Sequence, residues 1–133
     1  MLRVVHQGKI SMKLSQNVED YLETIYLLKK RNSDVRVKAI ASDLGITLPS
    51  VTEMIRKLTE KNLVTYKKYG PVDLTPKGKD VAKKVYAKHK LLVDFFISLG
   101  VDKKTAARDA CIAEHVLSSK TLNKLKSFTK NRR

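Results

Sequence analysis

The sequence contains a single cysteine, Cys111, among its 133 residues. One cysteine excludes an intramolecular disulfide framework and suits a reducing cytoplasm. No apolar run approaches the roughly 20 residues that a membrane-spanning helix requires. The opening residues, 1–7, lack the long apolar stretch that marks a secretory signal, and neither an internal repeat nor a low-complexity linker is present. We therefore expect a cytoplasmic globular protein with no membrane-embedded part.

Acidic residues are scarce in this sequence. It has 13 aspartates and glutamates against 28 lysines and arginines, which gives a formal net charge of +15. Such an excess costs self-repulsion in a small domain and therefore calls for a reason. Nucleic acid is the usual partner, because each neutralised phosphate releases condensed counterions. Acidic membrane surfaces and simple solubility are the alternatives. An apolar fraction of 42% argues against general disorder.

Hydrophobic periodicity predicts two helices early in the chain. Residues 1–13 are basic and lack clear periodicity, so we expect a flexible arm. Apolar residues recur at helical spacing over residues 14–28, with Ser15 as the expected N-cap. A short amphipathic helix follows over residues 37–44, and Gly45 closes it at the C-cap position.

The next predicted helix begins after Thr47, its expected N-cap, with Pro49 in the first turn. Two short helices joined by a tight glycine turn are typical of a helix-turn-helix. Alternating β-branched and aromatic residues over 63–75 surround a turn at Gly70-Pro71 and predict a hairpin, which makes the motif winged.

The remainder of the chain is predicted to be helical. A long helix is expected from Pro76 to Gly100, a second over residues 103–117, and a short last one from Ser118. The expected fold class is therefore mainly α. We expect a winged helix-turn-helix DNA-binding domain over residues 14–76, followed by a helical unit over residues 77–133.

The outward face of the second helix of this motif is the predicted DNA-reading surface. Four residues point outward when the apolar stripe faces the core: Ser50, Glu53, Arg56 and Lys57. Because arginine reads guanine best, we expect Arg56 to contact a base or a phosphate, with Ser50 and Thr52 as short hydrogen-bonding partners. The other residues assigned to DNA start this helix or lie on the preceding helix and the hairpin tip: Arg36, Lys38, Thr47, Pro49, Lys67, Lys68 and Tyr69. The alternative is that Arg56 pairs with Glu53 or Glu60 and that the hairpin lysines are simply solvated.

A second group of residues has metal-binding chemistry and is spread over three predicted helices: Asp20, Glu23, His89, Cys111, Glu114 and His115. The acidic pair lies beside the apolar stripe of the first helix. The last three residues share one helical face, where thiolate, carboxylate and imidazole suit a first-row metal. His89 falls on the apolar row of the long helix. Taken singly, each has an ordinary explanation: a core histidine, a small apolar cysteine, or carboxylates paired with lysines.

Five segments occur in a familiar order: residues 18–28, 49–54, 74–78, 88–92 and 109–118. Together they resemble the diphtheria-toxin-repressor family, which includes iron-dependent repressors and manganese transport regulators. The resemblance extends from Leu14 to Thr129. It implies a homodimer in which residues 77–133 form a helical metal-binding and dimerisation domain. In this family, metal at the junction of the two domains sets the spacing of the recognition helices on a palindromic operator.

The resemblance also implies roles for the metal-binding candidates. Glu114, His115 and His89 match ligand positions shared across the family, and Asp20 and Glu23 match positions of the manganese-type site. Cys111 matches a position where the iron repressors have cysteine. Because aspartate favours Mn²⁺ while thiolate favours Fe²⁺, Co²⁺ or Zn²⁺, the expected cofactor is Mn²⁺ or Fe²⁺. Two departures, Val93 and Ala107, stand where iron-type members have further ligands, so an ancillary site around His89 is expected to be incomplete.

We therefore expect a non-enzymatic repressor of iron or manganese homeostasis genes. It should bind double-stranded DNA as a homodimer, with no membrane partner. Metal is expected to tie Asp20 to Cys111, Glu114 and His115 and so to restrict hinge motion before DNA binds. One alternative is a winged-helix regulator that responds to a small organic ligand or to none. The other is a metal-dependent nuclease that uses the same carboxylates and imidazole.

Overall fold

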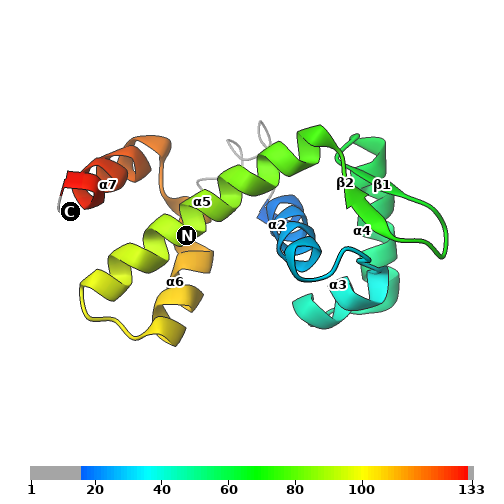
Figure 1. Cartoon of the computed structure of the whole chain (residues 1–133), viewed down its shortest axis with the longest axis horizontal. Coiled ribbons are helices and arrows are strands. Elements are labelled where there is room, and N and C mark those ends of the chain that lie inside the picture. Colours follow the sequence, from blue (N-terminus) through cyan, green and yellow to red (C-terminus); the bar gives the residue numbers. More distant parts are fainter. Residues whose placement is uncertain (1–15, 132–133) are drawn as a thin grey trace. The chain divides into compact units, whose positions relative to one another are not determined.

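The computed structural model describes residues 16–131, which contain six helices and one two-stranded sheet (Figure 1). The order of elements is α2 (Gln16–Arg31), α3 (Val37–Leu44), α4 (Leu48–Glu60), β1 (Val64–Tyr66), β2 (Val72–Leu74), α5 (Pro76–Ser98), α6 (Lys103–Val116) and α7 (Ser119–Asn131). The mainly α class is confirmed. The predicted arm over residues 1–13 and the predicted cap Ser15 lie outside the described residues.

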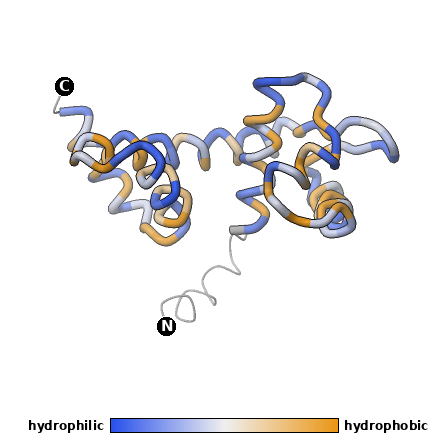
Figure 2. The backbone as a smooth tube through the Cα atoms, turned by 90° about the horizontal axis from the view of Figure 1, so that it is seen from below, coloured by the Kyte–Doolittle hydropathy of each residue, from blue (hydrophilic) through white to orange (hydrophobic). Residues whose placement is uncertain are grey.

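The chain divides into two compact units, and the division falls between Lys83 and Lys84, within α5. The N-terminal unit has a core of apolar residues from α2, α3, α4, the hairpin and the first turns of α5. The C-terminal unit has a smaller core around Leu92, Ala110 and Leu122. Hydrophobic residues recur at intervals along the helices instead of forming long runs, as an amphipathic arrangement requires (Figure 2).

Local signals in the sequence explain the helix-turn-helix. Gly45 ends α3 in the left-handed conformation, with φ of 69°, which a residue without Cβ adopts at little cost. The Thr47 hydroxyl accepts a hydrogen bond from the Ser50 backbone N–H at 3.3 Å and so caps α4, as predicted. Val51 and Ile55 of α4 are fully buried, which leaves the opposite side of the helix exposed.

The hairpin forms, but its turn differs from the predicted one. Figure 1 shows β1 and β2 side by side near α4, and they pair antiparallel with Thr65 opposite Asp73. The Gly70 backbone N–H donates to the Lys67 carbonyl at 2.7 Å, so the tight turn is centred before the predicted Gly70-Pro71 pair. Tyr69, and not a glycine, takes the positive φ of 65°. The expected position of the turn was therefore wrong, whereas the expected wing is confirmed.

Gly78 fixes the approach of α5 to the hairpin. A Cβ atom at this position would lie 2.0 Å from the carbonyl oxygen of Leu63, a distance that real Cβ atoms do not reach. The Gly78 backbone N–H also donates a hydrogen bond to the Thr75 hydroxyl at 3.0 Å, at the start of α5. A glycine is therefore required for the backbones to come this close.

The C-terminal helices follow the predicted order. Asp102 caps α6 by accepting a hydrogen bond from the Thr105 backbone N–H at 3.0 Å. This bond and a second one from the Thr105 side chain lower the pKa of the Asp102 carboxyl. The last helix, α7, has 13 residues and is longer than the short helix expected. Within residues 16–131, no helix combines the length and apolar character needed to cross a membrane.

Candidate DNA interface and metal centre

The predicted reading face of α4 is exposed. Ser50, Glu53, Arg56 and Lys57 all lie on the solvent side, as does Thr52. The Thr47 hydroxyl donates to the Ser50 hydroxyl at 2.8 Å, so two short polar side chains are held together at the start of the helix. This face carries the donors and acceptors that a helix in a major groove requires.

Arg56 is held by two carboxylates on its own helix. Its guanidinium lies 2.5 Å from Glu53 and 2.6 Å from Glu60. The hydrogen bond to Arg56 lowers the pKa of the Glu53 carboxyl, and the same bond raises the pKa of the guanidinium. The alternative pairing that the sequence allows is therefore present, and it involves both glutamates. A base or phosphate contact by Arg56 has to compete with these two carboxylates.

Three links attach the hairpin to α2 and to the segment between α2 and α3. The Val72 backbone N–H donates to the Val35 carbonyl at 2.7 Å. Lys29 forms an ion pair with Asp73. The guanidinium of Arg36, a predicted phosphate contact, donates to the Tyr69 carbonyl at 2.7 Å and to the Asp34 carboxylate at 3.1 Å. Part of the hydrogen-bonding capacity of Arg36 thus positions the hairpin tip, which sequence spacing did not indicate.

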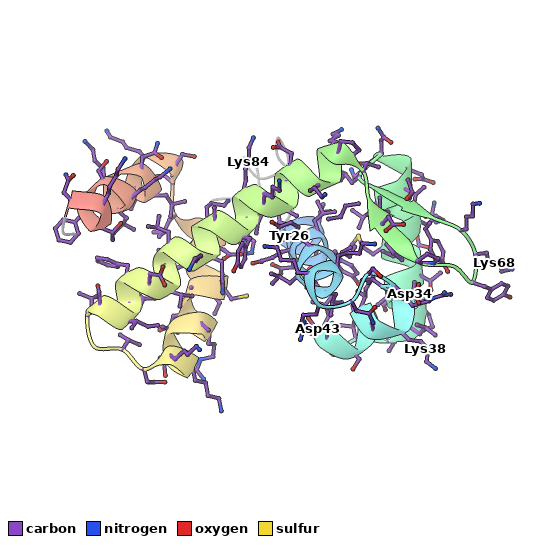
Figure 3. The ribbon with its side chains drawn as sticks, in the orientation of Figure 1. Tyr26, Asp34, Lys38, Asp43, Lys68 and Lys84 are labelled. Atoms are coloured by element: carbon purple, nitrogen blue, oxygen red, sulfur yellow. The ribbon has the colours of Figure 1, made fainter. Side chains whose placement is uncertain are left out.

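The remaining basic residues of the predicted interface are exposed. Lys38 lies on α3, and Lys68 lies at the end of the hairpin, pointing away from the helices (Figure 3). The ammonium of Lys68 stands 5.3 Å from the centre of the Tyr69 ring, and 83% of Tyr69 is exposed. Lys67 is exposed beside them. The hairpin tip therefore offers two cations and an aromatic ring to solvent.

The C-terminal unit contains a buried carboxylate between two imidazoles. The side chain of Glu114 on α6 has 0% of its surface exposed. One of its oxygens, Oε1, lies 3.0 Å from Nδ1 of His89 on α5, and the other, Oε2, lies 3.3 Å from Nε2 of His115. His115 is itself almost fully buried, with 4% of the side chain exposed. Two helices thus bring together three of the six predicted ligands.

The donor atoms of this cluster fit a divalent transition metal. Among the described residues, Oε2 of Glu114 accepts no hydrogen bond, although it is buried. A buried carboxylate oxygen without a donor is costly unless a cation or proton meets it. Imidazole and carboxylate together are ligands that Mn²⁺, Fe²⁺ and Zn²⁺ accept. The residues present therefore suit the metal that the family resemblance implies.

The other predicted ligands differ in exposure. On α2, Glu23 is buried with 8% exposed, and Asp20 is half-buried. Cys111 is exposed, although it precedes the buried Glu114 by only one turn of α6. Spacing alone placed the three α6 residues on one face, but it did not distinguish the buried members from the exposed one.

A winged helix-turn-helix followed by a helical unit with a carboxylate–imidazole cluster defines a class of DNA-binding regulator that carries metal-ligand chemistry. Residues 13–72 match the iron dependent repressor N-terminal DNA binding domain, and residues 75–133 match the iron dependent repressor metal binding and dimerisation domain. The chain belongs to this family of metal-dependent transcriptional repressors.

The sequences and structures of individual relatives are consistent with membership of this family. An HTH-type transcriptional regulator of Methanocaldococcus jannaschii is 43% identical over 117 residues, which are 86% of this chain and 94% of the relative. The regulator MntR of Bacillus pumilus is 37% identical over 82% of this chain and 76% of its own length. The solved structure of the manganese regulator SloR superposes with a TM-score of 0.74 at 32% identity. That match covers 85% of this chain and 53% of SloR, so the chain spans about half the length of the solved relative.

Proposed function

We propose that this protein is a repressor that binds its operator as a homodimer when Mn²⁺ or Fe²⁺ is bound, and that it regulates genes of iron or manganese homeostasis. The observation that carries the proposal is the buried Glu114 carboxylate, which lies between His89 and His115 and whose Oε2 accepts no hydrogen bond from residues 16–131. The family match supports both the DNA-binding and the metal-binding assignments. The proposed domain limits are residues 14–76 for DNA binding and residues 77–133 for metal binding and dimerisation.

The proposed ligands come from both units of the chain. Glu114, His115 and His89 supply a carboxylate and two imidazoles from the C-terminal unit. Asp20 and Glu23 supply carboxylates from α2, and Cys111 supplies a thiolate, as the family resemblance implies. A bound divalent ion would place a positive charge beside the buried Glu114 carboxylate. These side chains must lose their protons to bind it, so metal affinity should fall in acid.

Ligands on both units would restrict motion between the N-terminal and the C-terminal unit. Part of the conformational entropy that DNA binding would otherwise cost is then already lost when metal binds. By linkage, metal and operator strengthen each other's binding by the same factor. The exposed face of α4 and the hairpin tip are the proposed DNA contacts. A protein that acts on chromosomal operators in this way is expected in the cytoplasm, and no catalytic role is proposed for it.

Operator titration with and without metal tests the proposal. A labelled duplex, selected from random sequence by the Mn²⁺-loaded protein, is titrated in Mn²⁺, in Fe²⁺ and in chelator, and anisotropy reports binding. We expect affinity to rise at least about tenfold with metal, as a coupling free energy of ordinary size gives. Equal affinity in chelator would leave a winged-helix regulator without metal control. Cleavage of the duplex in Mg²⁺ would instead favour the nuclease alternative.

A pair of variants tests the contribution of α2. Asp20→Asn removes a proposed ligand charge, whereas Glu19→Gln removes the same charge from the neighbouring residue. We expect Asp20→Asn to abolish most of the metal response and Glu19→Gln to retain it. An identical response in both variants would remove Asp20 from the ligand set.

A further inference from the structure

The N-terminal unit contains a hollow lined mostly by lysines. It has a volume of about 570 Å³ and lies among α2, β2 and the start of α5. The charged and aromatic residues that line it are Tyr26, Lys29, Lys30, Asp73, Lys79 and Lys83. The volume falls within the range of roughly 300–1,000 Å³ that small-molecule sites occupy. Every lining residue belongs to one compact unit, so the hollow is a feature of that unit alone.

The hollow lies on the side of α2 that faces away from the DNA-reading surface. A second hollow, beside the exposed face of α4, is lined from α2 by Asn17 and Tyr21. Tyr26 follows Tyr21 by five positions, which places the two residues about 140° apart around the helix axis. The two hollows therefore flank the buried stripe of α2 on opposite sides. A ligand in the lysine-lined hollow would therefore occupy a different site from a DNA phosphate contacted by α4.

The side chains of the hollow are arranged by specific contacts. Lys29 pairs with Asp73 and also donates to the Ser33 carbonyl at 2.9 Å, so its ammonium has a fixed position. The ammonium of Lys30 stands 4.8 Å from the centre of the Tyr26 ring. On α5, Lys79 and Lys83 are four residues apart and lie on one face of the helix. Two helices, α2 and α5, thus contribute lysines to one open hollow, and β2 contributes Asp73.

The charge of this lining is strongly positive. The lining carries four lysines and one aspartate, and like charges gathered around one hollow repel one another unless an anion is bound. Near neutral pH, one phosphate group carries about −1.5 to −2 charge, so two phosphates on one molecule balance the excess. A concave site of this size accepts a small ligand better than it accepts the convex backbone of a duplex. We propose that the hollow binds a small anion with two or more phosphate groups.

Isothermal titration calorimetry on the full chain tests this proposal. Sodium tripolyphosphate and ATP are titrated separately at about 150 mM salt, where exposed charges are screened beyond a Debye length of about 8 Å. Chelator is present, so that the probes do not compete for metal and the result is independent of the proposed metal response. We expect saturable binding with one site per chain. Absence of saturable heat with both probes would overturn the proposal.

Two matched variants locate the site. Lys79→Gln with Lys83→Gln removes two lining charges, and Lys120→Gln with Lys124→Gln removes two exposed charges at the same spacing on α7. The first variant should bind tripolyphosphate about tenfold more weakly, as expected for two charge contacts near a protein surface. The second should bind like the unmodified chain. Equal weakening in both would show a net-charge effect only, and would overturn the proposal.

A duplex arm distinguishes a small ligand from DNA. Both variants are titrated with a labelled non-operator duplex at the same salt concentration. We expect the two variants to lose duplex affinity equally, because each lacks two positive charges. If Lys79→Gln with Lys83→Gln weakens duplex binding more than tripolyphosphate binding, then the lysines serve a DNA backbone and the small-ligand proposal fails.

Discussion

Replacement of Glu114 by glutamine should affect stability in opposite directions with and without metal. In the metal-free protein, the buried carboxylate has an oxygen that accepts no hydrogen bond among the described residues. An unsatisfied buried acceptor costs about 1–3 kcal/mol, and a neutral amide is less costly to bury than a carboxylate. The flanking imidazoles recover part of that cost. We therefore expect Glu114→Gln to stabilise the metal-free protein by about 1 kcal/mol, or about 4 °C in Tm.

With metal bound, the unmodified chain should be more stable than the Glu114→Gln variant. Metal at about 100 times its Kd stabilises the unmodified chain by about 2.7 kcal/mol, or about 10 °C. If loss of a direct ligand weakens metal binding about 100-fold, then the same metal concentration stabilises the Glu114→Gln variant by only about 0.4 kcal/mol. The unmodified chain should then melt about 4 °C above the variant, although it melts below the variant in chelator.

Thermal unfolding followed by circular dichroism, in chelator and in Mn²⁺, measures both differences. Asp109→Asn is the matched control, since Asp109 is exposed on the same helix and should change neither value. The reasoning about the buried oxygen is refuted if Glu114→Gln destabilises the metal-free protein. The ligand assignment is refuted if the variant keeps the full metal-dependent rise in Tm.

Two further substitutions test the N-terminal unit. Gly78→Ala should destabilise the protein by about 3 kcal/mol, because the new Cβ would meet the Leu63 carbonyl oxygen at 2.0 Å. Urea unfolding measures the free energy of unfolding. A destabilisation no larger than that caused by Lys77→Ala would contradict the prediction. Glu60→Gln should remove one of the two carboxylates that pair with Arg56. The guanidinium is then more available to phosphate, so non-specific DNA binding should tighten. The slope of log K against log salt should steepen by up to about one unit, and an unchanged slope would show that Arg56 does not approach phosphate.

Much of the fold was predictable because local chemistry determines it. Thr47 and Gly45 mark the ends of α4 and α3 through hydrogen bonding and backbone conformation, and both were identified from the sequence. The sequence predicts the hairpin turn at Gly70-Pro71, but the hydrogen bond from Gly70 to Lys67 places it earlier. Tyr69 adopts the left-handed conformation instead, and the Arg36 bond to its carbonyl depends on contacts distant in the chain.

The site was predictable in its residue types and less so in its pairing. His89 and Glu114 are 25 residues apart on different helices, so no spacing rule links them. The available signal was that His89 falls on the apolar row of α5. The exposure of Cys111 was likewise not predictable, because burial depends on which neighbouring helix covers each part of α6. The resemblance to the family supplied the ligand positions, and the structure adds the contacts of Glu114.

The attachment of the hairpin at Val35, Arg36 and Lys29 has a consequence for the choice of operator. Since the wing is fastened to the same body that carries α4, the distance between a groove read by the helix and a groove touched by the wing is constant. Half-sites in which those two positions are shifted by a base pair should be rejected whatever the state of the C-terminal unit. A regulatory signal could then change the separation between the two half-sites that a dimer contacts, but not the spacing of contacts within one half-site.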